Sequence, residues 1–358
     1  MNRKIVAAFV AALVLAAPRS GHAQQSDSDR ERVERDREKA QEAADRAREK
    51  AQEARERALE KAQEARDRGL QRAQELRERE QERRERERQA AGSLDTTVVF
   101  DAHGTVSVTC QGGAVIVIGS DRNEIKVRAR TESGGIRFTS TGTRATLEPS
   151  QGRGCSDGHF EITVPVGTHV SATSWSGSVS VRGVHGDVET RTQSADIELR
   201  DIGRLELETM SGDVTVQTVK GDATIHTISG DVSVNGVQGN LEVETVSGDL
   251  GLRDIVARQV RTHTTSGDVD FDGQILEAGR YEFNTHSGEI RLALPPNVGA
   301  QLTITTFNGS IDSDFPITLR PGDHSESKRL NFVLGQGSAR ILAETFSGDV
   351  NLKSTGRP

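Results

Sequence analysis

The stretch that decides the fold runs from Leu207 to Leu250 and reads LETMSGDVTVQTVKGDATIHTISGDVSVNGVQGNLEVETVSGDL. It contains the triplet Ser-Gly-Asp at 211–213, 229–231 and 247–249, so the triplet returns every 18 residues. Two weaker turn signals, Lys220-Gly221-Asp222 and Gln238-Gly239-Asn240, lie about halfway between. Self-similarity at a fixed period is the signature of a repeat architecture.

The repeat continues in both directions from this stretch. Related triplets are Ser176-Gly177-Ser178, Ser194-Ala195-Asp196, Ser266-Gly267-Asp268, Ser287-Gly288-Glu289, Asn308-Gly309-Ser310 and Ser347-Gly348-Asp349. Successive triplets are 17 to 21 residues apart, except for a last step of 39. Apolar residues alternate after each triplet, as in Val214 and Val216, and alternation places them on one face of a strand.

Each half of the unit holds one short strand and one turn, which cannot bury an apolar face alone. Stacking like units about 4.8 Å apart pairs every backbone group with the units above and below. We therefore predict a mostly β protein, a parallel β-solenoid (β-helix) of about 18-residue coils, preceded by a long charged α-helix. A β-sandwich of short strands is the alternative.

Residues 1–23 are predicted to be a secretory signal peptide. Arg3 and Lys4 precede an apolar run from Ile5 to Ala17, and small residues follow at 21–23. An uncleaved anchor is the alternative. No second apolar stretch follows, so we expect no integral membrane span after signal cleavage. The expected location is extracytoplasmic: periplasmic, cell surface or secreted.

Residues 24–91 are predicted to be a charged helical spacer or a weak coiled coil. The pentapeptide Lys-Ala-Gln-Glu-Ala starts at Lys39, Lys50 and Lys61, which gives an 11-residue repeat. Charged residues three and four apart support an isolated helix. An alanine stripe near the helical period could instead allow self-association through the helix, in a straight or slightly right-handed assembly.

Residues 92–171 are predicted to form irregular first β units, and residues 172–358 the β-solenoid repeats. Both cysteines, Cys110 and Cys155, fall in the first of these segments. In an oxidising compartment we expect them to form a structural disulfide that closes a loop of about 45 residues. Two unrelated buried thiols are the alternative.

The net charge of −8 is carried by the β region. Residues 92–358 contain 34 Asp and Glu against 23 Lys and Arg, so we expect no nucleic acid partner. The sequence shows no phosphate-binding glycine loop before a helix, no zinc-type Cys and His spacing and no GxSxG motif.

One candidate site is the acidic position of the triplet. Its members are Asp196, Asp213, Asp231, Asp249, Asp268, Glu289 and Asp349. Stacked carboxylates about 4.8 Å apart repel by roughly 0.9 kcal/mol per neighbour in water. We expect each aspartate to cap its own turn through backbone N–H groups. The alternative is a row of weak Ca²⁺ sites at Asp213, Asp231, Asp249 and Asp268, which would be the only cofactor.

A second column lies three residues before each triplet. It contains Arg191, Glu208, His226, Glu244, His263 and Asn284, and strand alternation turns it outward. We expect complementary pairing between neighbouring strands, with a His and Glu metal or acid–base site as the alternative.

Three aromatic residues, Trp175, Phe307 and Phe346, directly precede a triplet. We expect them to form a packing stack. A sugar-binding strip would favour a glycan-processing β-helix enzyme.

A family resemblance rests on the run from Val164 to Thr168, Val-Pro-Val-Gly-Thr, followed by Ser176-Gly177-Ser178-Val179 and serial Ser-Gly-Asp-Val units. Over about residues 96–352 the chain resembles the bacterial putative-adhesin β-strand-repeat family. The resemblance implies an extracytoplasmic β-helical domain of unknown function, with no established catalytic residues to carry over. The charged helix is not part of the family pattern.

We therefore expect a protein that is not an enzyme: an envelope scaffold or adhesion-type interaction protein that contacts a cell-envelope polymer or a surface protein. A self-assembling structural protein is a further alternative.

Overall fold

The computed structural model describes residues 27–89, 92–131, 135–150, 158–316 and 328–355. The predicted signal peptide and Cys155 lie outside these ranges, so both predictions stay predictions; Cys110 is buried at the end of a strand. The chain divides into two compact units between Glu80 and Gln81. Each is described by itself.

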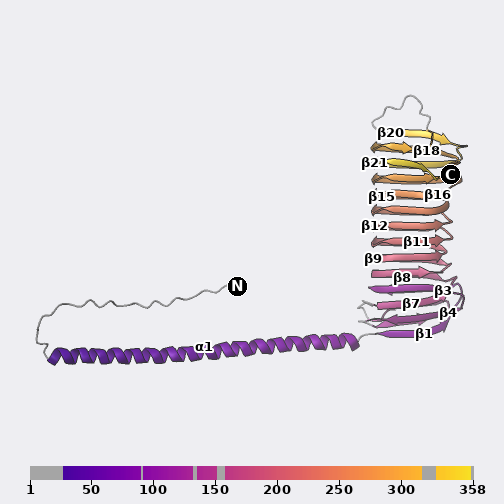
Figure 1. The fold of residues 1–358 in the computed structure, drawn as a ribbon. Coiled ribbons are helices and arrows are strands. Elements are labelled where there is room, and N and C mark those ends of the chain that lie inside the picture. Colours follow the sequence, from indigo (N-terminus) through magenta and orange to yellow (C-terminus); the bar gives the residue numbers. More distant parts are fainter. Residues whose placement is uncertain (1–26, 90–91, 132–134, 151–157, 317–327, 356–358) are drawn as a thin grey trace. The chain divides into compact units, whose positions relative to one another are not determined.

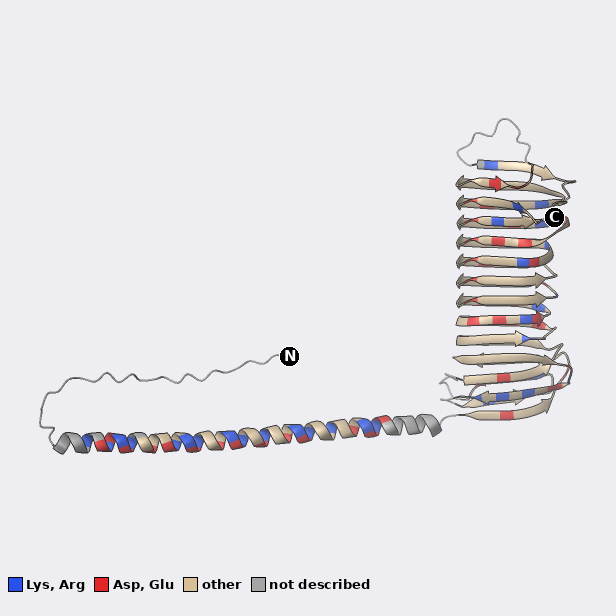
Figure 2. Cartoon of the chain, viewed as in Figure 1, with Lys and Arg blue, Asp and Glu red and all other residues tan. Residues whose placement is uncertain are grey.

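The first unit is dominated by the helix α1, Asp27–Gln89 (Figures 1 and 2). Ion pairs one turn apart recur every 11 residues: Glu42–Arg46 at 3.6 Å, Glu53–Arg57 at 3.6 Å and Glu64–Arg68 at 2.8 Å. Pairs of this spacing stabilise a helix without a partner. Between residues 41 and 80 every side chain is exposed, the alanine stripe included. Among the described residues, no helix has the length and apolar character that a membrane crossing requires.

The second unit is a stack of strands (Figure 1). The first seven strands are β1 (Ser93–Val99), β2 (Thr105–Cys110), β3 (Gly113–Ser120), β4 (Glu124–Arg130), β5 (Ile136–Ser140), β6 (Arg144–Pro149) and β7 (Gly158–Pro165). The next eight are β8 (His169–Arg182), β9 (Asp187–Ile202), β10 (Arg204–Ser211), β11 (Val214–Val219), β12 (Ala223–Ser229), β13 (Val232–Val237), β14 (Leu241–Ser247) and β15 (Leu250–Ser266). The last seven are β16 (Val269–Ser287), β17 (Ile290–Leu294), β18 (Ala300–Asn308), β19 (Ile311–Ser313), β20 (Lys328–Leu334), β21 (Ala339–Ser347) and β22 (Val350–Ser354).

The central strands pair in parallel in two ladders. The first ladder runs β9–β10–β12–β14–β15–β16, and the second runs β9–β11–β13–β15–β16–β17. In the middle of the stack, facing residues are 18 apart in sequence, as in Ala223 opposite Leu241 and Val214 opposite Val232. We call one level of the stack a rung. Continuous parallel pairing makes the unit solenoid-like and rules out the β-sandwich alternative.

The core lies between the two ladders. Alternate residues point into it, so Val214, Val216, Val232 and Val234 are each at most 1% exposed. Their polar neighbours face outward, as the sequence alternation predicts.

The two ends of the stack depart from parallel pairing. At the N-terminal end β1 pairs with β4, β4 with β7 and β5 with β6, all antiparallel. At the other end β20 pairs antiparallel with β18. Chain order and spatial order also differ there, because β21 lies between β16 and β18, and β22 between β17 and β19. The 39-residue step before Ser347 therefore includes β19 and β20 and returns the chain to a rung inside the stack.

Candidate functional site: the corner of the repeat

The Ser-Gly-Asp triplets form a corner that joins the first ladder to the second in each rung. The corner glycines take a positive φ, 110° at Gly212, 122° at Gly230 and 134° at Gly248. A Cβ added to Gly230 would lie 2.2 Å from the carbonyl oxygen of Gly212, one rung below. Glycine is required here both by the backbone conformation and by the neighbouring rung. Ala195 occupies the equivalent position in a rung where φ is not positive.

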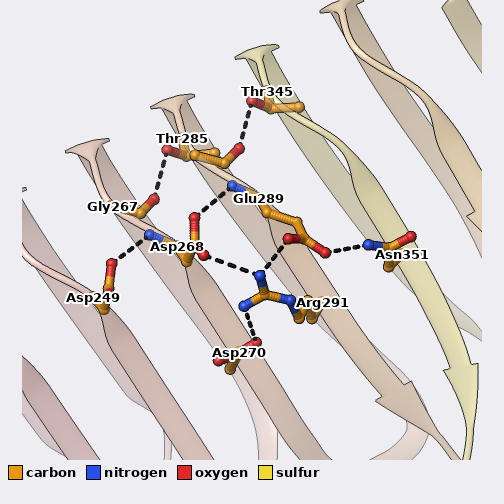
Figure 3. Close-up of polar contacts among 10 residues, drawn as sticks. Asp249, Gly267, Asp268, Asp270, Thr285, Glu289, Arg291, Thr345 and Asn351 are labelled. Atoms are coloured by element: carbon orange, nitrogen blue, oxygen red, sulfur yellow. Dashed lines mark hydrogen bonds and ion pairs between the residues drawn. The ribbon is translucent and has the colours of Figure 1, made fainter.

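A column of buried threonines stands behind the corner. The hydroxyl of Thr209 donates to the carbonyl of Ser211 at 3.0 Å. The hydroxyl of Thr285 donates to Gly267 at 3.2 Å, and that of Thr345 to Gly288 at 3.1 Å (Figure 3). These bonds satisfy carbonyl groups that the turn leaves unpaired. These three threonines therefore fasten their corners to their own rung or to the rung below.

The acidic column is held by backbone bonds between rungs (Figure 3). From Asp196 to Asp268, each carboxylate accepts the backbone N–H of the acidic residue one rung further on. The bonds are Asp213 to Asp196 (3.2 Å), Asp231 to Asp213 (3.2 Å), Asp249 to Asp231 (2.9 Å), Asp268 to Asp249 (2.8 Å) and Glu289 to Asp268 (2.9 Å), donor first. The prediction that each Asp caps its own turn is therefore wrong: the N–H group that the carboxylate binds belongs to the next rung. Stacking brings the next rung's N–H within reach of the carboxylate.

The Ca²⁺ alternative at Asp213, Asp231, Asp249 and Asp268 stays a prediction. Each of these carboxylates has one oxygen engaged by the next rung. Among the described residues, no group of three or more His, Cys, Asp or Glu is arranged to hold a metal ion.

Arg291 supplies a cation at the C-terminal end of the acidic column (Figure 3). Its guanidinium lies 3.1 Å from Asp268 and 3.1 Å from Asp270, and it also bonds Glu289. Glu289 in turn accepts a bond from Asn351. Bonds to Glu289 and Asp270 raise the pKa of the Arg291 guanidinium above its ordinary value. The side chain thus offsets repulsion among carboxylates that the stack brings together. It lies outside the triplet register, so the sequence pattern gave no sign of it.

The outward column, which we call the ionic column, lies on the first ladder. Arg191 bonds Glu208 at 3.1 Å, and His226 lies 3.2 Å from Glu244. Arg191 also contacts Glu206 at 3.6 Å. These contacts are the cross-strand pairing that the sequence predicts. His263 follows Glu244 in the column, opposite Asn284.

Large apolar side chains line the corner directly beside the ionic column. We call this set the corner stripe. Its members and exposed fractions are Trp175 (64%), Met210 (49%), Ile228 (49%), Val246 (49%), Phe346 (46%) and Phe307 (42%). Met210 and Ile228 are among the residues that line a shallow open groove of about 320 Å³. Arg191, Glu208 and His226 of the ionic column also line it.

The aromatic members stack only in part. Phe346 stacks on Phe307 with ring centroids 5.0 Å apart, and on His286 at 4.9 Å. Trp175 belongs to the same column but lies several rungs away, between β2 and β9. The predicted packing stack therefore holds for the two phenylalanines and not for Trp175.

The family can be assigned from the β unit. The Toastrack DUF4097 family profile matches residues 105–353. The chain belongs to this family. Toastrack proteins are the putative-adhesin group that the triplets resemble, and α1 lies outside the matched residues. No curated protein matches the chain.

Three solved structures are similar to this Toastrack chain at low identity. A putative cell adhesion protein from Clostridium sporogenes is 10% identical, with 74% of this chain and 100% of that chain covered and a TM-score of 0.23. A putative adhesin from Bacteroides fragilis is 13% identical, with 73% and 96% covered and a TM-score of 0.34. A putative lipid binding protein from Parabacteroides distasonis is 9% identical, with 73% and 96% covered and a TM-score of 0.33.

Proposed function

We propose that this Toastrack protein is a non-catalytic, extracytoplasmic envelope scaffold or adhesion-type interaction protein. Its β unit is a β-solenoid of about 18-residue coils. The partner that it binds is a cell-envelope polymer or a surface protein. The extracytoplasmic location rests on the predicted signal peptide. Family membership supports an interaction role without naming the ligand.

One observation carries the proposal: a flat polar face on the second ladder. Thr215 faces Ser233, and Gln217 faces Asn235, in register on neighbouring strands. Gly251 and Arg253 continue the two rows on the next rung. We call these six residues the polar face. Hydroxyl and amide groups repeat on two adjacent rungs about 4.8 Å apart and suit a ligand that itself repeats, because both rungs can make the same hydrogen bond.

The acidic column borders this face but is engaged in bonds within the stack. Glu198 is held similarly: a hydrogen bond from Arg182, at 2.8 Å, lowers the pKa of Glu198 below its ordinary value. Carboxylates fixed in this way support a structural rather than an acid–base role. The polar face therefore acts through hydrogen bonds.

The test is co-sedimentation of the chain from residue 24 onward with isolated cell-envelope fractions, with and without EDTA. The matched variants are Asn235→Arg on the polar face and Thr224→Arg on the outward side of the first ladder. We expect binding that Asn235→Arg weakens at least about tenfold and Thr224→Arg leaves unchanged. Equal binding by both variants would contradict the polar face.

A second arm uses residues 92–358, which lie within the second compact unit. Binding that requires α1 would move recognition to the helix, and loss in EDTA would point to the Ca²⁺ alternative at the acidic column. Release of reducing sugar ends from the envelope fraction would instead support the glycan-processing enzyme.

A further inference from the structure

The corner stripe and the ionic column lie side by side on the outward face of the first ladder. The six apolar side chains together expose on the order of 500 Å², the upper end of what a soluble monomer leaves open. Met210, Ile228 and Val246 occupy three successive rungs near the middle, while Gln193, Thr265 and His286 take the same position on the rungs that separate them from the aromatic members. Trp175 stands at one end, and Phe346 and Phe307 at the other. An exposed apolar surface of this size suggests a binding partner, and the polar residues beside it indicate which partner fits.

The ionic column alternates a nitrogen-bearing side chain, Arg or His, with a carboxylate along the stack. The order by rung is Arg191, Glu208, His226, Glu244, His263. An alternating column is complementary to itself when a second copy runs in the opposite direction and is offset by an odd number of rungs. A two-fold axis perpendicular to the stack, passing between the rungs of Ile228 and Val246, gives that offset.

We propose that this surface is the interface of an antiparallel homodimer. The two-fold axis places Ile228 against Val246 of the second copy, and Val246 against Ile228. In the ionic column, His226 meets the second copy's Glu244, and Glu208 meets the second copy's His263. Each histidine can donate a ring N–H to the facing carboxylate. An isologous contact of this kind uses the same patch on both copies.

The outer positions include one favourable pair and one like-charged pair, since the axis places Glu189 opposite the second copy's Glu282. Glu206, whose row lies beside the ionic column, faces the second copy's Arg261. Trp175 at one end of the corner stripe faces Phe346 from the other end, so the two most distant aromatic groups meet. The stripes alone would bury on the order of 1,000 Å², and the flanking columns bring the total into the range of stable interfaces.

Other occupants fit the charges less well. A parallel second copy would place Glu208 against Glu208 and Glu244 against Glu244, which repel. An anionic lipid surface would meet the carboxylates that flank the stripe on both sides. The proposed dimer is independent of the polar face, which belongs to the other ladder.

The first test measures molar mass by light scattering after gel filtration, on the chain from residue 24 onward at about 100 µM and below. Trp175 is the single tryptophan, so its emission reports directly on the interface. We expect a dimer whose Trp175 emission shifts to the blue as protein concentration rises. Ile228→Glu should weaken dimerisation at least about 100-fold, because the axis buries two unpaired charges.

The matched control is Val333→Glu on β20, which changes an equally exposed valine (60%) outside the stripe and should leave the dimer intact. A monomer at 100 µM, or a dimer that survives Ile228→Glu and so forms elsewhere, for example through α1, would overturn the proposal. So would a blue shift that requires phosphatidylglycerol vesicles rather than protein concentration.

The second test fixes the direction of the two copies. The Trp175→Cys and Phe346→Cys variants are mixed and oxidised gently, with the parent chain beside them to account for Cys110 and Cys155. The antiparallel axis predicts a disulfide-linked heterodimer and no linked dimer of either variant alone, because equivalent positions lie several rungs apart. A disulfide-linked dimer in the Trp175→Cys sample alone would show that the two copies run parallel.

Discussion

Replacing Gly230 by alanine tests whether the corner glycines set the distance between rungs. The new Cβ would lie 2.2 Å from the carbonyl oxygen of Gly212, about 1 Å inside normal contact, at a φ of 122°. The backbone strain costs about 1–3 kcal/mol. Relieving the overlap moves these two rungs apart and weakens two corner bonds between them, Val214 N–H to Asp231 (2.9 Å) and Asp231 N–H to Asp213 (3.2 Å), at about 1 kcal/mol each.

We therefore expect Gly230→Ala to lower the free energy of unfolding by about 3–5 kcal/mol, and the melting temperature by about 10 °C. The assay is guanidinium unfolding followed by circular dichroism, with calorimetry beside it. The control is Gly251→Ala, whose Cβ would meet no atom within 4 Å, and which should change stability by less than about 0.5 kcal/mol. Equal effects of the two substitutions would refute the steric reasoning.

Three further substitutions probe other positions of the stack. Thr218 is a β-branched residue at a φ of 61°, so Thr218→Gly should stabilise by up to about 1 kcal/mol in the same unfolding assay; destabilisation would contradict the strain. Arg291→Gln should destabilise by about 1 kcal/mol at low salt, since the side chain is partly exposed, and the difference should shrink in 0.5 M NaCl. Hydrogen bonds from Lys220 and His185 lower the pKa of Asp201, so its contribution to stability is present above about pH 4 and is lost as the pH falls through the folded-state pKa. The stability difference between the parent chain and Asp201→Asn should therefore vanish in acid, and a difference that is constant down to pH 2.5 would count against this assignment.

Local periodicity predicted most of the central stack. The 18-residue spacing of the triplets is the spacing of Ala223 and Leu241 across the first ladder, because parallel stacking converts a sequence period into a spatial one. The buried and outward positions follow from strand alternation, and so does the contact between His226 and Glu244.

The sequence did not predict the contacts that depend on which rung lies next in the stack. The carboxylate of Asp231 accepts a hydrogen bond from the following rung rather than from its own turn, because the spacing between rungs brings that N–H group within reach. The insertion of β21 between β16 and β18 is equally invisible in the pattern, since Ser347 carries an ordinary triplet. Arg291 reaches three carboxylates only because two neighbouring rungs bring them together.

The length of the stack and the way it ends are set by different strands. The parallel pairs in the middle set the length, and the antiparallel pairs lie at the two ends. A parallel ladder presents the same edge at every level and could in principle continue into another molecule. Here β4 and β5 run against the stack at one end and β20 does so at the other, so the regular parallel pairing is interrupted near both ends. Growth of such a protein over evolutionary time is then confined to its middle. Duplicating one 18-residue unit there would lengthen the stack by about 4.8 Å and leave both closing structures untouched.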